Sequence, residues 1–79
     1  MKTIKIRFVK NNKGYYNIQR KVWFKWKYLG YSVDMGYGGF YAYYTGETKE
    51  TLLEEVLDSH YQVCRKHVEI IEYPTIKIY

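Results

Sequence analysis

The stretch that decides the fold lies at residues 15–29 and reads YYNIQRKVWFKWKYL. It contains no proline, glycine or acidic residue, and it is rich in the aromatic residues that strands favour. Apolar and polar side chains alternate with a period of two, which is typical of a half-buried strand. We therefore predict one long strand: its apolar face carries Tyr16, Ile18, Val22, Phe24, Trp26 and Tyr28, and its basic face carries Lys21, Trp23, Lys25 and Lys27.

The segment before this strand predicts a hairpin partner. Residues 4–9 alternate apolar with basic side chains, which again indicates a half-buried strand. Residues 11–14, Asn-Asn-Lys-Gly, are typical of a turn, because asparagine and glycine tolerate positive φ. In the simple hairpin register, Lys5 and Arg7 extend the basic face of residues 15–29.

The segment after it is rich in glycine and tyrosine. Residues 30–39 contain four glycines, which indicates either a long loop or a short irregular strand followed by a turn. Residues 40–44, Phe-Tyr-Ala-Tyr-Tyr, favour a strand. Residues 4–44 are thus expected to form a β-β-β unit.

One helix is expected from about Lys49 to Lys66. Thr48 is a suitable N-cap, because its hydroxyl can accept a hydrogen bond from an N–H of the first turn. Apolar side chains recur at helical spacing and form a stripe that would pack on the sheet. The stripe contains Leu52, Leu53, Val56, Leu57, His60, Val63, Cys64 and His67.

The C-terminal segment predicts a further strand at residues 68–72. Pro74 ends this strand or marks a sheet edge. Residues 75–79 alternate and leave room for a fifth, short strand, whose free edge could pair with a second copy of the chain. The predicted fold class is α+β: a single domain over residues 1–79, with a small, mostly antiparallel sheet in the order β-β-β-α-β and one helix packed on one face.

Charge and cysteine content narrow the function classes. The net charge of +5 conceals a division, because residues 1–27 contain nine basic residues and no acidic one. One cysteine excludes an internal disulfide framework, which favours an intracellular, cytoplasmic protein over a small secreted one. No apolar run has the length of a membrane span, and the charged N-terminus lacks the pattern of a signal peptide.

Residues with catalytic or metal-binding chemistry are few. His60, Cys64 and His67 would share one helix face and could bind a zinc ion, but a structural zinc site needs four ligands. The same spacing is typical of side chains at the edge of a core, and we prefer this interpretation to a metal site. No nucleophile stands beside a base and an orienting group, so we predict a binding protein without enzymatic activity, metal or cofactor.

The basic face predicts contact with nucleic acid. Lysine and arginine bind phosphate, and an exposed tryptophan can stack on a base. The same lysines could instead serve only to keep a sheet soluble. We expect nucleic acid or a nucleoprotein complex as partner, bound through Lys5, Arg7, Lys21, Trp23, Lys25 and Lys27, with stacking from Tyr37, Tyr41 and Tyr43.

The alternative is a protein partner with an acidic surface. Tyrosine, glycine and serine in residues 31–39 are typical of loops that bind proteins, and Trp23 would add an aromatic anchor. A tiny domain with one aromatic surface and no active site is similar in style to small phage-encoded inhibitors and adaptors. Such a protein could bind a nuclease that handles nucleic acid.

Overall fold

The computed structural model describes residues 2–78 and contains seven strands and one principal helix. Four strands form the main sheet in the order β3-β2-β1-β7, and the short strand β6 pairs with β2. β1 is antiparallel to β2 and parallel to β7, so the sheet is mixed. The predicted α+β class is confirmed. The strands are β1 (Lys2–Lys10), β2 (Tyr16–Val22), β3 (Lys25–Tyr28), β4 (Gly30–Asp34), β5 (Gly39–Tyr43), β6 (Thr45–Gly46) and β7 (Val68–Lys77).

The predicted first hairpin is confirmed. Asn11 closes its loop, because the Asn11 side-chain oxygen accepts hydrogen bonds from the backbone N–H groups of Lys13 (2.9 Å) and Tyr15 (3.1 Å). β1 and β2 then pair with Arg7 opposite Gln19. This register fixes which side chains of the two strands share a face.

The prediction of one long strand at residues 15–29 is wrong. The chain reverses at Trp23 and Phe24, and Val22 pairs directly with Lys25 across this two-residue turn. A two-residue turn places the residues on either side of it on the same face, so the alternation continues after the turn with inverted parity. Trp26 and Tyr28 therefore lie on the opposite face of the sheet from the one we predicted.

The helix begins where the sequence predicts and ends earlier. The Thr48 hydroxyl accepts the N–H of Thr51 at 3.2 Å, which confirms the N-cap of α1 (Lys49–Val56). One π-helical turn, η1 (Leu57–Tyr61), follows, and the left-handed residue Gln62 (φ 55°) ends the helix. The predicted end at Lys66 is wrong, because the chain has to reverse here to start β7 beside the N-terminal end of β1.

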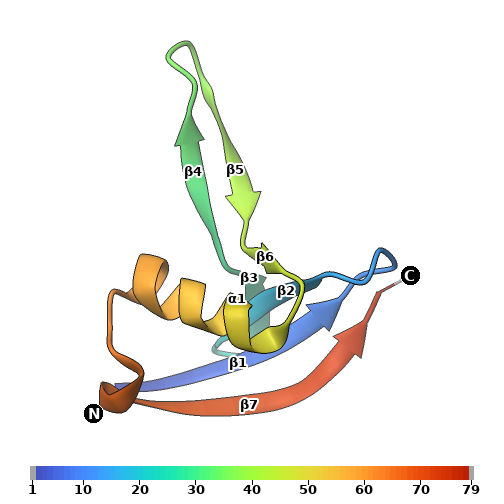
Figure 1. Ribbon diagram of the computed structural model, residues 1–79, viewed down its shortest axis with the longest axis vertical. Helices are drawn as coiled ribbons and strands as arrows, with labels where there is room; N and C mark the ends of the chain where they lie inside the picture. The colour runs from blue at the N-terminus through green and yellow to red at the C-terminus, as the bar shows by residue number, and fades with distance from the viewer. Residues whose placement is uncertain (1, 79) are drawn as a thin grey trace.

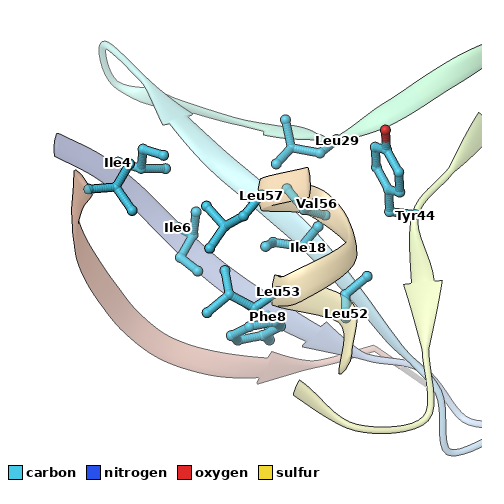
Figure 2. Close-up of a cluster of buried hydrophobic side chains, with 11 residues drawn as sticks. Ile4, Ile6, Phe8, Ile18, Leu29, Tyr44, Leu52, Leu53, Val56 and Leu57 are labelled. Atoms are coloured by element: carbon cyan, nitrogen blue, oxygen red, sulfur yellow. The ribbon is translucent and has the colours of Figure 1, made fainter. Parts of the chain in front are cut away.

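The core lies between α1 and one face of the main sheet (Figure 2). Every second residue of β1 points into it. The helical segment α1–η1 contributes four apolar residues that lie on successive turns. Each of these side chains stabilises the fold by ~1.5–3 kcal/mol relative to exposure to water. The central members are Ile4, Ile6, Phe8, Ile18, Leu52, Leu53, Val56 and Leu57.

β4 and β5 form a separate two-stranded sheet, named here the arm, which projects away from the helix and the main sheet (Figure 1). Of the two readings of residues 30–39, the short strand followed by a turn is confirmed. The base of the arm is anchored, because Leu29 and Tyr44 are core residues and the Tyr44 N–H donates to the Leu29 carbonyl at 3.0 Å. Gly30 permits the strands to meet there, since a Cβ at this position would lie 2.3 Å from the Ala42 oxygen.

β7 is one continuous edge strand. Its pairing with β1 shifts between Arg7 and Val9, and Pro74 lies in that shift. A residue without an N–H is tolerated at an irregular position of an edge strand. Of the two readings of Pro74, the one in which it marks a sheet edge is confirmed. The prediction of a separate short strand after Pro74 is wrong, because residues 75–77 continue β7; Tyr79 lies outside the described residues.

Candidate nucleic-acid interface

The face of the main sheet opposite α1, named here the outer face, combines cations with aromatic rings. Strand alternation places on it the side chains that neighbour the core residues in sequence. The pairing of the four strands then brings residues from distant parts of the chain together. The outer face contains Lys5 and Arg7 from β1, Gln19 and Lys21 from β2, Trp26 and Tyr28 from β3, and Glu69, Ile71 and Tyr73 from β7.

Arg7 lies at the centre of the outer face and is held from two sides. Its Nε donates a hydrogen bond to the Gln19 side-chain oxygen at 2.6 Å, and its guanidinium carbon lies 4.4 Å from the centroid of the Trp26 ring. Gln19 is only 6% exposed, so its amide is a well-fixed partner. Arg7 is therefore a pre-positioned guanidinium that already lies against one ring, and a guanidinium fixed in this way is suited to phosphate.

A second cation–ring pair lies beside the first. The Trp26 and Tyr73 rings meet edge to face at 5.1 Å between centroids, and the Lys21 ammonium lies 5.2 Å from the Tyr73 centroid. The cations therefore lie on the two central strands, β1 and β2, and the rings lie on the flanking strands, β3 and β7. The outer face carries three cations, Lys5, Arg7 and Lys21, and one carboxylate, Glu69. The net charge of these four side chains is therefore positive.

The aromatic row continues from the outer face onto the arm. The Tyr28 and Tyr43 rings lie 5.0 Å apart, and the Tyr43 and Tyr41 rings lie 5.6 Å apart. Tyr41 and Tyr43 are both more than half exposed. Two groups of contacting rings therefore meet at β3: Trp26 with Tyr73 on the outer face, and Tyr28 with Tyr43 and Tyr41 toward the arm.

The structure brings together only part of the predicted site. Lys5, Arg7 and Lys21 share the outer face, as the hairpin register predicts. Lys25 and Lys27 lie on the opposite face of the β2–β3 hairpin, so the prediction of one basic face carrying all of these residues with Trp23 is wrong. Of the predicted tyrosines, Tyr41 and Tyr43 are on the arm strand β5, and Tyr37 is an exposed residue of the loop at the arm's end.

Trp26, Tyr28 and Tyr73 are the outer-face residues that the sequence analysis missed. The sequence predicts one strand without a turn over residues 15–29, which places Trp26 and Tyr28 on the apolar face that packs in the core. A reading of Trp23-Phe24 as a turn would have found them, but neither residue is typical of tight turns. Tyr73 joins the face through the parallel pairing of β7 with β1, for which the local sequence carries no signal.

The β2–β3 turn, at the end of this face, has an unusual backbone conformation and two exposed aromatic side chains. Trp23 adopts a left-handed backbone conformation (φ 59°), which is disfavoured for a residue with a large side chain. Trp23 is 86% exposed and Phe24 is 92% exposed. The predicted exposure of Trp23 is thus confirmed, although at a turn and not on a strand face.

His60, Cys64 and His67 do not form a common cluster. His60 belongs to η1, Cys64 precedes the short 3-10 helix η2 (Arg65–His67), and all three residues are exposed. The prediction that they share one helix face is wrong, since the helix ends before Cys64. Within residues 2–78, no three histidine, cysteine or acidic side chains gather in a way that could hold a metal ion.

The pKa of His60 is lowered, which predicts a pH-dependent stability. Its ring packs edge-on against Tyr44 and Tyr61, and partial burial, followed by the charges of Arg20 and Lys2, lowers the pKa below the ordinary 6.5. The unfolded chain therefore takes up this proton at a higher pH than the folded protein does. Stability should be unaffected by His60 above about pH 7.5 and should fall as the pH drops below about 6.5.

The variant His60→Asn tests this expectation. The free energy of unfolding, measured in urea from about pH 7.5 to about pH 5.5, should decline less steeply in the variant than in the wild type. Equal slopes for both proteins would show that His60 does not contribute to the acid sensitivity.

None of the helical segments between Lys2 and Ile78 combines the length and apolar character that crossing a bilayer requires. In comparisons with known proteins, no family model, no curated protein and no solved structure matches this chain.

Proposed function

We propose that the protein is a binding module, without enzymatic activity or cofactor, that holds a single-stranded segment of nucleic acid on its outer face. The observation that carries the proposal is the contact of Arg7 with Trp26 and of Lys21 with Tyr73 on one sheet face. Proteins that bind single strands combine cations that follow the phosphates with rings on which the bases stack. A helix-backed sheet presents both groups on a rigid surface.

The proposal gives each group of the outer face a role. Lys5, Arg7 and Lys21 neutralise backbone phosphates, and Trp26 and Tyr73 offer stacking surfaces for one or two bases. Tyr28 and Tyr43 extend the stacking surface toward the arm. Because contacts to phosphates and to the faces of bases carry little sequence information, we expect weak sequence preference.

The experiment is a salt titration of binding to a short single-stranded oligonucleotide, as RNA and as DNA, followed by fluorescence anisotropy. For three phosphate contacts on a single strand, the plot of log K against log salt should have a slope of about −2. The variant Lys21→Ala should reduce the slope by about 0.7, whereas Lys13→Ala, in the loop between β1 and β2, serves as the control with the same charge change. Undetectable binding at low salt would overturn the proposal.

The arm favours a second candidate function, an inhibitor or adaptor that binds a protein. Its strands carry one charged side chain, Asp34, and they expose Phe40, Tyr41 and Tyr43. An isolated two-stranded hairpin is only marginally stable in water, so a contact along the arm would stabilise it. If a partner captured from nuclease-treated lysate is lost with Phe40→Ser but retained with Lys21→Ala, the protein acts through the arm and not through nucleic acid.

A further inference from the structure

The turn between β2 and β3 carries two aromatic side chains that do not contribute to the core. In Figure 2 the hairpin runs out to this turn beyond the cluster of core side chains. Trp23 and Phe24 are the most exposed tryptophan and phenylalanine of residues 2–78, and Trp23 adopts its left-handed conformation where glycine or asparagine would be relaxed. Strain and exposed apolar area at one position indicate a contact that compensates for both.

Cations flank this turn on both faces of the hairpin. Lys21 lies on the outer face, whereas Arg20, Lys25 and Lys27 lie on the opposite face, and all four side chains are exposed. At ~3.4 Å per residue, these cations lie within about 10 Å of the turn. The charges therefore form a collar around the hairpin behind the two aromatic rings.

A single strand of nucleic acid on the outer face contacts only one side of this collar. A nucleic-acid strand that follows Arg7 and Lys21 cannot also reach Lys25 and Lys27, because the β-sheet lies between them. The second side of the collar therefore fits a second phosphate backbone.

We propose that the β2–β3 turn recognises the junction at which a duplex opens into the single strand held on the outer face. Trp23 and Phe24 stack on the last base pair, Lys21 contacts one backbone, and Lys25 and Lys27 contact the other. This inference rests on the proposed function, because the single-stranded tail is the segment that occupies Arg7, Trp26 and Tyr73. It adds the class of ligand, which is a nucleic acid with a fork or a stem that continues as a single strand.

The test compares three fluorescent oligonucleotides: a duplex with a single-stranded tail, the tail alone and the blunt duplex. The wild type should bind the tailed duplex roughly 10-fold or more tightly than the tail, the gain that stacking on one base pair provides. The double variant Trp23→Gly with Phe24→Ala should lose most of this preference and keep only the part that Lys25 and Lys27 supply, and its affinity for the tail should be unchanged. Glycine is relaxed at this φ, so the variant should melt no lower than the wild type.

Further measurements separate the outcomes. Lys27→Ala should weaken binding of the tailed duplex only, and Lys13→Ala should leave the preference for the junction unchanged. Equal affinity of the wild type for tail and tailed duplex would overturn the junction and leave the proposed function standing. If the protein binds none of the oligonucleotides, both the proposed function and junction recognition are overturned. If the turn binds anionic vesicles and the protein shows no preference for the tailed duplex, the turn contacts a lipid surface and junction recognition is overturned.

Discussion

Replacing Phe8 with alanine is expected to destabilise the protein by ~3–5 kcal/mol. The Phe8 ring is 1% exposed, packs edge-on against Tyr16 at 6.3 Å and lies beneath the ammonium of Lys49. Removing it leaves a cavity between α1 and the sheet that the surrounding side chains cannot fill. A domain of 79 residues has a total stability of roughly 4–12 kcal/mol, so the variant should lose a large part of it.

Phe24→Ala is the matched control for this prediction. The chemical change is identical, but Phe24 is 92% exposed at the β2–β3 turn. We expect a change within about 0.5 kcal/mol in the free energy of unfolding, measured by urea denaturation. A loss at Phe24 as large as that at Phe8 would show that the turn is packed against the body of the protein.

Replacing Trp26 with alanine is expected to reduce affinity for a single-stranded oligonucleotide by roughly 5- to 150-fold, equivalent to ~1–3 kcal/mol of stacking. The reason is twofold: the variant removes a stacking ring, and it removes the ring that positions the Arg7 guanidinium. Affinity is measured by fluorescence anisotropy at low salt, at a temperature where circular dichroism shows the variant to be folded.

Two variants separate stacking from other effects. Trp26→Phe retains an aromatic ring and should retain most of the affinity. Trp23→Gly removes the other tryptophan, at the turn, and should leave the affinity for a single strand unchanged. If Trp23→Gly weakens single-strand binding and Trp26→Ala does not, the bound strand lies on the turn and not on the outer face.

The elements that follow from local sequence were predicted well. The Asn11 turn and the Thr48 cap depend on side chains that satisfy nearby backbone groups, so their sequence signals are local. The α+β class follows from the order of strand-like and helix-like periodicities. The end of the helix at Gln62 was missed, because apolar residues continue at helical spacing beyond the point where the chain has to reverse.

The composition of the site could not be predicted in full, because it depends on one turn and one distant pairing. Trp23 and Phe24 are not the residue types that mark tight turns, and Val22, Phe24, Trp26 and Tyr28 keep one apolar parity through them. The turn inverts the parity of the residues that follow it, so Trp26 lies on the outer face and Lys25 and Lys27 lie on the opposite face. Tyr73 meets Trp26 only because β7 pairs with β1, which long-range packing determines.

The most direct test of the outer face is the response of the two tryptophan indole N–H signals in proton–nitrogen correlation spectra to a single-stranded oligonucleotide at low salt. We predict that the Trp26 signal shifts, together with backbone amides of β1, β2 and β3 around Arg7 and Lys21, while the Trp23 signal and the amides of α1 stay in place. An unchanged Trp26 signal at an oligonucleotide concentration that shifts Trp23 or α1, or the absence of any shift, would contradict the assignment of the outer face as the binding surface.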